Sequence, residues 1–338
     1  MKITLKDAAE KISQAEKILV TAHINPDGDA IGSTLAMLQI LRSMNKKVVA
    51  YIDDKLPKNF ITLPYAEEIK RPQENKKISA DLVVILDTAP DRIGKILEIT
   101  DAPILNIDHH VTNKNEENFL YVEPTAAATC EIIFSLTKIL GVKITEEIAI
   151  CLYTGLATDT GFFNYSNTKP ATFRAAAELV ECGVKPNLIA ENVEKRTASE
   201  VKVISLALRT TKLFYGGKVV GMFVDEKLAK QTDTTEGLID LIRVIDSVEV
   251  AFLLTEKGKN FCRVSMRSKT VNVSEIAQKL GGGGHVRAAG CTINENFEDA
   301  KNILIQAIGK YLVETKKISQ ADFEKVIEIE LADFEINI

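Results

Sequence analysis

The sequence contains no tryptophan, only four histidines and only five cysteines among its 338 residues. The cysteines are scattered, without a CxxC pair or a close Cys/His cluster, at positions 130, 151, 182, 262 and 291. A disulfide framework or a zinc knuckle needs closely spaced cysteines, so the pattern argues against both. Unpaired cysteines are typical of a reducing compartment, and we therefore expect a cytoplasmic protein.

Long apolar runs and an excess of positive charge are also absent. No stretch of the sequence approaches the roughly 18 apolar residues of a membrane-spanning helix, and the first residues lack the apolar segment of a signal peptide. The net charge is −5, so the sequence offers no general basic surface for the phosphates of long nucleic acid. We expect neither a membrane nor a long duplex as a partner.

The first half of the chain alternates short apolar runs with a helical pattern. Apolar residues recur three or four positions apart over residues 31–44, which predicts a helix. The apolar runs are too short for helices and predict strands at residues 17–24, 46–53, 81–87 and 103–108. Such runs are typical of parallel strands covered on both faces, so we predict an α/β domain with a mostly parallel sheet.

Helical patterns dominate from residue 129 to 213, and a smaller α/β (α+β) domain follows. Its predicted strands lie at 218–224, 248–256 and 260–268, and its predicted helices near 236–245, 273–280 and 297–314. A hydrophobic fraction of 46% is sufficient for two cores. We divide the chain into a first domain (1–183), a helical linker (184–215), a second domain (216–315) and an extension of unknown role (316–338).

Acidic residues and histidines follow three of the predicted strands of the first half. They are His23, Asp27, Asp29, Asp87, Asp108, His109 and His110. Parallel strands bring their carboxyl ends to one edge of a sheet, where ligands bind, so we expect these side chains to converge. Asp159 ends a helical stretch, and Gly161 after it suits a sharp turn back towards the sheet.

Carboxylates at one edge need a counter-charge, because like charges a few ångströms apart resist joint ionisation. Divalent cations are the simplest compensation, and carboxylates combined with imidazole favour manganese, with zinc or cobalt as alternatives. The ligands suffice for two ions, the arrangement that activates water and neutralises a phosphate. Taken one at a time, the same residues have ordinary explanations as turn formers, helix N-caps or buried histidines. Their joint occurrence favours a metal site.

Four segments resemble, in order, the motifs of the DHH phosphoesterase superfamily. They are AHINPDGDAIGS, LDTAPDRIG, NIDHH and GLATDTGFF. The resemblance covers residues 1–315, and it is closest to the stand-alone enzymes that degrade very short RNA and 3′-phosphoadenosine 5′-phosphate. It implies a hydrolase whose first domain is catalytic and holds two manganese ions per chain.

The resemblance also implies a role for each matching residue. The ligands fall into two groups with one member in common: His23, Asp27 and Asp87 for one ion, and Asp29, Asp87, His109 and Asp159 for the other. Asp87 would then bridge the ions. His110 would face the scissile phosphate, and Asp108 would orient the neighbouring histidine.

A run of glycines stands out in the second half, in GGGGHVRAAG at residues 281–290. Glycines after a helical stretch are a common helix stop, but a glycine-rich turn can also close on a phosphate. The segment resembles the signature of the DHH-associated domain, which implies substrate contacts for Gly283, Gly284, His285 and Arg287. The preceding RVSMRS resembles that domain's substrate-contacting strand, so Arg267 would grip a terminal phosphate or a base.

Two further segments have more than one interpretation or none. EPTAAATCE at 123–131 is an ordinary helix start capped by Thr125 or Thr129, or a small-residue segment that places Thr129 near the substrate, as in the family. The end of the chain alternates apolar and acidic residues over VIEIEL, which predicts an exposed edge strand without a functional role.

The leading hypothesis is a two-manganese phosphodiesterase and phosphatase. Its substrates would be short RNA or DNA oligonucleotides and small nucleotides such as 3′-phosphoadenosine 5′-phosphate. One alternative is a phosphodiesterase for cyclic dinucleotides or their linear products, and another is a non-catalytic nucleotide sensor on the same fold. Manganese pyrophosphatases share the four motifs but lack the GGGH loop. A homodimer is one assembly that the sequence leaves open.

Overall fold

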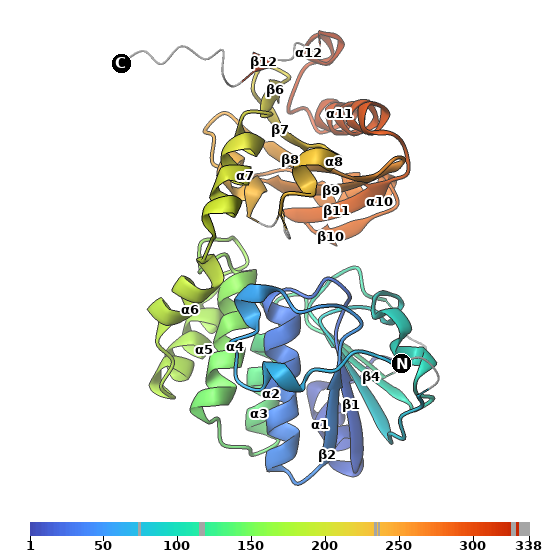
Figure 1. Cartoon of the computed structure of the whole chain (residues 1–338), viewed down its shortest axis with the longest axis vertical. Helices are drawn as coiled ribbons and strands as arrows, with labels where there is room; N and C mark the ends of the chain where they lie inside the picture. Colours follow the sequence, from blue (N-terminus) through green and yellow to red (C-terminus); the bar gives the residue numbers. More distant parts are fainter. Residues whose placement is uncertain (74–75, 115–118, 233–234, 236, 326–328, 331–338) are drawn as a thin grey trace. The chain divides into compact units, whose positions relative to one another are not determined.

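The chain forms two compact units in a computed structural model, Met1–Lys195 and Arg196–Ile338 (Figure 1). The structure describes residues 1–73, 76–114, 119–232, 235, 237–325 and 329–330. The boundary falls within the segment 184–215, which supplies α6 (Pro186–Glu194) to the first unit. It supplies α7 (Ala198–Leu208) and β6 (Lys212–Phe214) to the second unit.

A five-stranded parallel sheet in the order β2-β1-β3-β4-β5 lies at the centre of the first unit. The strands are β1 (Lys17–Thr21), β2 (Lys47–Tyr51), β3 (Leu82–Leu86), β4 (Ile104–Asp108) and β5 (Phe119–Val122). All five residues of β3 are buried, as expected for a strand covered on both faces. The predicted α/β fold and its four strands are confirmed. The fifth strand, β5, was missed because it is short and only partly buried.

Helices and short 3₁₀ turns surround this sheet. The helices besides α6 are α1 (Leu5–Gln14), α2 (Gly28–Ser43), α3 (Thr129–Ile139), α4 (Glu146–Asp159) and α5 (Pro170–Glu181). The 3₁₀ turns are Lys58–Phe60, Ala66–Glu68, Pro90–Arg92 and Gly94–Glu98. Fourteen consecutive residues of α2 are buried, since α2 packs alongside α4 as well as against the sheet (Figure 1). A Cβ atom at Gly32 would lie 2.4 Å from the carbonyl oxygen of Cys151, so glycine permits this close packing.

The parallel order of the sheet decides where the polar motifs meet. β1 lies beside β3, and β3 lies beside β4, all in the same direction. Residues that follow these strands therefore emerge along one edge, where α2 and α3 also begin. The fold thus brings together side chains from four separated segments of the sequence.

The second unit contains a seven-stranded mixed sheet in the order β10-β11-β9-β8-β7-β6-β12. Its strands besides β6 are β7 (Val219–Val224), β8 (Val250–Gly258), β9 (Phe261–Ser268), β10 (Gly283–His285), β11 (Ala288–Ile293) and β12 (Ile329–Glu330). Its helices besides α7 are α8 (Glu226–Ala229), α9 (Leu238–Ile242), α10 (Val273–Lys279), α11 (Phe297–Glu314) and α12 (Gln320–Glu324). The smaller α+β domain predicted from the sequence is confirmed.

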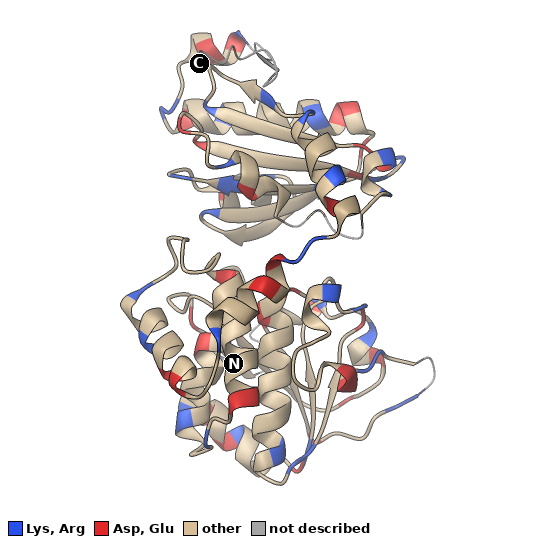
Figure 2. Ribbon diagram, turned by 60° about the vertical axis from the view of Figure 1, so that its left-hand side comes forward, with Lys and Arg blue, Asp and Glu red and all other residues tan. Residues whose placement is uncertain are grey.

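The edge strand predicted over residues 326–331 falls partly outside the described residues. Its described part, β12, pairs antiparallel with β6 at the edge of the sheet. Lys and Arg are interspersed with Asp and Glu along the elements of both units (Figure 2). Among the described residues, no helix combines the length and the apolar character needed to cross a membrane.

Candidate metal centre and substrate site

The first predicted ligand group lies where β1 and β3 end. His23 follows β1, Asp27 is the N-cap of α2, and Asp87 follows β3. The Nε2 atom of His23 lies 3.5 Å from Oδ2 of Asp87 and 3.8 Å from Oδ2 of Asp27. One potential ligand atom from each residue lies within 4.8 Å of the others. The three side chains therefore converge as a metal site requires.

Asp27 also has the structural role that turn chemistry predicts for it. Its Oδ1 atom accepts hydrogen bonds from the backbone N–H groups of Asp29 and Ala30, both at 3.0 Å. This is an N-cap of α2, which stabilises the helix. The cap uses Oδ1, while Oδ2 faces His23, so one carboxylate fits both interpretations.

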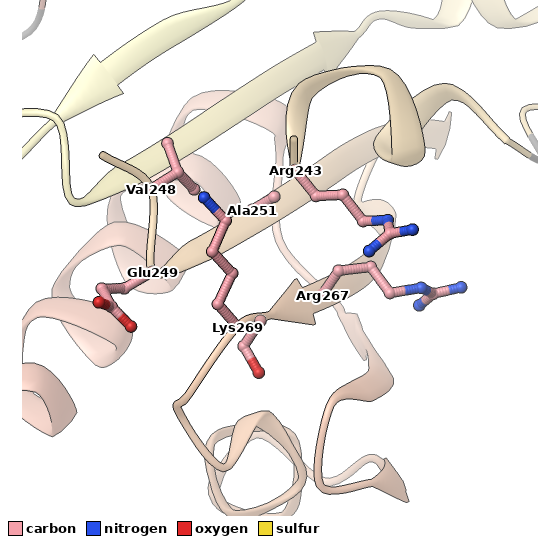
Figure 3. A pocket seen from close by; sticks show the side chains of 7 residues that line it. Arg243, Val248, Glu249, Ala251, Arg267 and Lys269 are labelled. Carbon is pink, nitrogen blue, oxygen red and sulfur yellow. The ribbon is translucent and has the colours of Figure 1, made fainter. Parts of the chain in front are cut away.

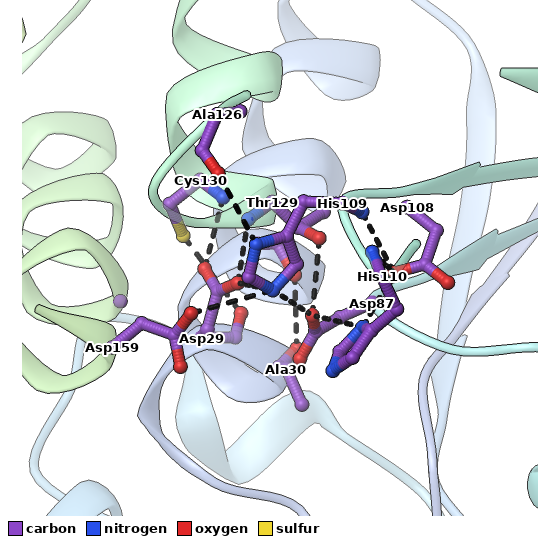
Figure 4. A network of polar contacts seen from close by, with 12 residues as sticks. Asp29, Ala30, Asp87, Asp108, His109, His110, Ala126, Thr129, Cys130 and Asp159 are labelled. Atoms are coloured by element: carbon purple, nitrogen blue, oxygen red, sulfur yellow. Dashed lines mark hydrogen bonds and ion pairs between the residues drawn. The ribbon is translucent and has the colours of Figure 1, made fainter. Parts of the chain in front are cut away.

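The second predicted ligand group gathers around His109 (Figure 4). Its Nε2 atom lies 3.3 Å from Oδ2 of Asp159, 3.4 Å from Oδ1 of Asp87 and 3.9 Å from Oδ2 of Asp29. Asp29, Asp87 and His109 again place one ligand atom each within 4.8 Å of one another. Asp87 therefore presents Oδ2 to the first group and Oδ1 to the second, the geometry that a bridging ligand needs.

Asp87 also has an unusual backbone conformation. Its φ of 62° lies in the left-handed region, which non-glycine residues rarely adopt. Strained backbone of this kind persists only where the surrounding structure holds it, and it gathers at functional sites. The left-handed conformation is consistent with a backbone that directs the Asp87 carboxylate towards both ligand groups.

The start of α3 holds Asp29 in place. The backbone N–H groups of Thr129 and Cys130 donate to its two carboxylate oxygens, at 2.6 Å and 2.9 Å. A Cβ atom at Gly155 would lie 2.7 Å from Oδ1 of Asp29, so only glycine lets α4 approach this closely. The contribution of Cys130 was missed from the sequence, because a backbone donor leaves no signature in residue types.

Thr129 was predicted to lie near the substrate. The structure places it fully buried, with its hydroxyl donating to Oδ1 of Asp87 at 3.1 Å. It therefore supports the two central carboxylates, Asp29 and Asp87, and its contact with substrate stays a prediction. The N-cap of α3 is Ala128, so neither Thr125 nor Thr129 caps this helix.

Both histidines of the ligand groups are oriented by backbone carbonyls. Nδ1 of His23 lies 2.9 Å from the oxygen of Ile24, and Nδ1 of His109 lies 3.4 Å from that of Ala126. In each ring, Nε2 is then the atom that faces the carboxylates. Ring orientation of this kind is common for metal-binding histidines.

Asp108 ties the Asp-His-His segment together. Its Oδ1 atom accepts from the backbone N–H groups of His109 and His110, and it lies 2.7 Å from Nδ1 of His110. Asp108 is fully buried, whereas the His110 side chain is 23% exposed and that of His109 only 3%. The more exposed histidine is therefore the better placed of the two to meet a substrate.

Two buried asparagines behind Asp108 were missed from the sequence. The side-chain amide of Asn113 lies 2.8 Å from Oδ1 of Asn106 and 2.7 Å from Oδ2 of Asp108, and it donates to both. Asn106 is fully buried inside β4, where a polar side chain must be satisfied by hydrogen bonds. An asparagine within an apolar strand was the signal that could have identified it.

The protonation behaviour of the cluster tests whether cations fit it. Burial lowers the pKa of His23, but the hydrogen bond to Asp87 and the charge of Asp27 outweigh it and raise the value to about 9. Burial raises the pKa of Asp159 to about 7, and burial with the charge of Asp87 raises that of Asp29 well above its usual value. Asp87 responds oppositely, because hydrogen bonds from His109 and His23 overcome burial and hold its pKa well below the usual range.

These shifts indicate that the carboxylates favour positive charge beside them. The raised pKa values favour a proton on His23 and on Asp159, and a divalent cation bound among the same groups would displace these protons. Oxygen and imidazole donors in this number suit manganese, and zinc or cobalt to a lesser degree. The residues present therefore fit a divalent-metal site, with Asp29, Asp87 and His109 the most deeply buried members.

The predicted substrate residues of the second unit share one corner of its sheet. Arg267 on β9 is in register with Ala288 on β11, and Ala288 is in register with His285 on β10. The backbone N–H of Ser268 donates to the carbonyl oxygen of Arg287 at 3.1 Å. The structure thus brings Arg267, His285 and Arg287 into one neighbourhood.

The glycine run serves two structural purposes. Gly281, with φ of 77°, follows the end of α10 and terminates it, while Gly283 and Gly284 form β10 with His285. Gly284 has φ of 136°, and a Cβ atom there would lie 2.7 Å from the carbonyl oxygen of Ala288. Glycine is therefore required to bring His285 beside β11.

A small pocket beside Arg267 was not predicted (Figure 3). Its lining residues are Arg243, Val248, Glu249, Ala251, Arg267, Ser268 and Lys269. Arg243 caps the end of α9, and nothing in the local sequence distinguishes it from a surface arginine.

Comparison with known families identifies the class of this chain. Residues 17–156 match the model of the DHH family, N-terminal domain, and residues 216–313 match that of the DHHA1 domain. The chain belongs to the DHH family of phosphoesterases and carries a DHHA1 domain, which makes it a hydrolase.

Two known proteins and one solved structure are similar to this chain over most of its length. The chain is 34% identical over 298 residues to the bifunctional oligoribonuclease and PAP phosphatase NrnA of Thermus thermophilus, covering 87% of this chain and 90% of that protein. It is 27% identical to the cyclic-di-AMP phosphodiesterase GdpP of Geobacillus thermodenitrificans, covering 89% of this chain and 48% of that protein. An exopolyphosphatase-related protein of Bacteroides fragilis shares the fold, with a TM-score of 0.82, 24% identity and coverage of 92% of this chain and 97% of that chain.

Proposed function

We propose that the chain hydrolyses short oligonucleotides and 3′-phosphoadenosine 5′-phosphate at a centre of two manganese ions. The similarity to an oligoribonuclease and PAP phosphatase over nearly its whole length supports the substrate class. The observation that carries the chemistry is Asp87, whose two oxygens lie in two separate groups of ligand atoms. One carboxylate that reaches two groups suits a pair of ions rather than one.

Each residue of the site would bind either a metal ion or the substrate. His23, Asp27 and Asp87 would hold one ion, and Asp29, Asp87, His109 and Asp159 the other. Bound manganese would supply Lewis acidity towards the phosphate and make water nucleophilic at neutral pH. His110 would bind the scissile phosphate through Nε2, because Asp108 engages its Nδ1. Burial lowers the pKa of His110, but the hydrogen bond and the charge of Asp108 outweigh it and raise the value, which favours the cationic ring.

A phosphodiesterase for cyclic dinucleotides is the second candidate. The similarity to GdpP supports it, although that relative is about twice as long as the matched part. A nucleotide sensor without activity is less consistent with the site, since sensors on an enzyme fold are expected to lose ligands, and all six proposed ligands converge here.

A substrate panel distinguishes these functions. The purified protein with manganese would be given 5′-phosphorylated dinucleotides and tetranucleotides, 3′-phosphoadenosine 5′-phosphate, cyclic dinucleotides and pyrophosphate. We expect turnover of the short linear nucleotides and the bisphosphate. Preferential turnover of cyclic dinucleotides would favour the second candidate, and no turnover of any of them would favour the sensor.

A further inference from the structure

The pocket beside Arg267 is formed where α9 ends against β8 and β9 (Figure 3). Its charged lining consists of three cations, Arg243, Arg267 and Lys269, and one acid, Glu249. The cross-strand neighbours of Arg267 are Ala251 and Ala288, whose short side chains leave room around the guanidinium group. The pocket is therefore positively charged, and it shares Arg267 with the corner of the sheet that also contains His285 and Arg287.

Two of the four charged groups are committed to the structure. The Nζ atom of Lys269 donates to the carbonyl oxygens of Ile245 and Asp246, at 2.6 Å and 2.9 Å, and so fixes the chain after α9. Glu249 accepts a hydrogen bond from Thr270 and lies 4.0 Å from Lys317. Arg243 and Arg267 are the other two, and they lie side by side in Figure 3 with both guanidinium groups directed to the same side.

The hydrogen bonding of Arg267 points to a missing anion. Its Nη1 atom donates to the carbonyl oxygen of Met266 at 3.1 Å, but its buried Nε has no hydrogen-bond partner in the described part of the chain. A buried, unsatisfied N–H of a charged group is costly, and an anion is its best partner. The neighbouring Arg243 is positioned through its Nε, which donates to Asp240 at 2.7 Å.

We propose that Arg243 and Arg267 together bind a terminal phosphate monoester of a short nucleotide substrate, and that Arg243 is a specificity-determining residue. Two guanidinium groups match the charge of a phosphate dianion and can each bind two of its oxygens. The proposal rests on the proposed function, because it names what part of that substrate this corner recognises.

Binding without turnover tests the proposal directly. The full-length protein, kept in chelator, would be titrated with three dinucleotides: one with a 5′-phosphate, one with a 3′-phosphate and one with neither. We expect a phosphorylated dinucleotide to bind more tightly than the unphosphorylated one. Arg243→Gln should weaken that binding roughly 10- to 100-fold and leave the unphosphorylated dinucleotide unaffected. The same variant assayed with manganese should show a raised KM for the phosphorylated substrate and little change in kcat.

Two control variants separate recognition from structure. Arg263→Gln removes an exposed guanidinium from the same strand, β9. Asp240→Asn removes the negative charge beside Arg243 but keeps an Oδ1 atom that can accept from its Nε, so both pocket arginines stay in place. Both controls should keep the preference for a terminal phosphate.

The possible results are distinct. An Arg243→Gln protein with an undiminished preference, an equal loss on all three dinucleotides, or a parent protein indifferent to terminal phosphates would each overturn the proposal. A parent that binds the phosphorylated dinucleotide but turns over no short nucleotide would instead overturn the proposed function alone.

Discussion

Asn106 holds the backbone on both sides of Asp87. Its side-chain amide donates to the carbonyl oxygen of Ile85 at 3.1 Å and to that of Thr88 at 2.7 Å. Asp87 lies between these two carbonyls with a left-handed φ of 62°. The same asparagine accepts a hydrogen bond from Asn113, which also binds Asp108. One buried amide thus links the carboxylate proposed to bridge the metals with the segment that carries both histidines.

We predict that Asn106→Leu weakens manganese binding by roughly 10- to 100-fold, the range found when groups that orient metal ligands are lost. Leucine has a similar volume but leaves both carbonyls without their donor, so Asp87 loses the support of its strained conformation. Titration of free manganese by its electron paramagnetic resonance signal would measure the loss.

Thr137→Val is the matched control for this variant. Thr137 is equally buried and donates to Ile133 within α3, away from the ligands. Both variants should lower the thermal unfolding temperature, but only Asn106→Leu should change metal affinity. If the two variants bind manganese alike, Asn106 contributes to folding and not to the site.

The sequence predicted the fold and the converging residues because both follow from strong local signals. Apolar runs such as that around Val83 indicate buried strands, and parallel strands oblige His23, Asp87 and His109 to meet at one edge. It could not predict how each carboxylate is held. The donors to Asp29 are backbone N–H groups at the start of α3, which any residue type would provide.

Arg243 shows the same limitation in the second unit. It comes next to Arg267 only because α9 ends beside β8 and β9, and this tertiary contact has no periodic pattern in the sequence. The structural role of Asn106 could have been predicted from the sequence. Asparagine is rare in buried strands, and a buried amide needs hydrogen-bond partners.

Metal removal should abolish activity. The proposed site contains carboxylates and histidines but offers no protein nucleophile, so turnover should depend on a divalent ion and be highest with manganese. The measurement is hydrolysis of a dinucleotide after exhaustive chelation and after restoration with manganese, zinc, cobalt or magnesium. Undiminished turnover in chelator would disprove the metal mechanism.

Asp87 is proposed to bind both ions and Asp27 only one, and this difference can be tested by changing each residue. Both would be changed to asparagine, which keeps the N-cap of α2 at residue 27 and tolerates the left-handed backbone at residue 87. We expect Asp87→Asn to impair the binding of both ions and Asp27→Asn to impair one, as measured by binding stoichiometry.

Activity should follow the same order, with a loss above about 100-fold for Asp87→Asn. Asp101→Asn provides the control, because Asp101 is an exposed acid of the same unit, paired with Lys77 at 3.3 Å. A more severe defect for Asp27→Asn than for Asp87→Asn would contradict the bridging assignment.

Metal affinity should rise with pH between about 7 and about 9. These are the raised pKa values of Asp159, where burial is the cause, and of His23, where Asp87 and Asp27 overcome burial. Below them the groups carry protons that a metal must displace, so binding should release protons. Calorimetric titration with manganese in two buffers of different ionisation enthalpy would count them.

The stability of the metal-free protein should change in the opposite direction. Both groups have a folded pKa above the unfolded value, so their stabilisation is fully present below the unfolded pKa and is lost as pH rises through about 7 and about 9. The rise in unfolding temperature caused by manganese should therefore be larger at pH 8.5 than at pH 6. In the metal-free protein, Asp159→Asn should remove the part of the pH dependence of stability near pH 7. In the parent protein, a manganese-induced rise that does not change with pH would contradict the shifts.

Substrate selection should reside in the second unit. A metal centre hydrolyses any phosphate ester that reaches it, so a preference for short nucleotides must come from groups that contact the rest of the substrate. Arg267 and His285 are such candidates, since β11 pairs with both of their strands. We predict that Arg267→Ala and His285→Ala bind manganese normally and lose most activity on dinucleotides. Both side chains can donate hydrogen bonds to a phosphate, and the guanidinium fork of Arg267 does so strongly and directionally.

Activity on a generic substrate separates selection from chemistry. The same two variants should keep more of their activity on bis-p-nitrophenyl phosphate, which lacks the nucleoside and terminal phosphate that these residues would recognise. Arg263→Ala, on the same strand as Arg267, should behave as the parent on both substrates. Equal losses on dinucleotide and generic ester, with manganese still bound, would mean that Arg267 and His285 do not select the substrate and that the glycine run around His285 is structural.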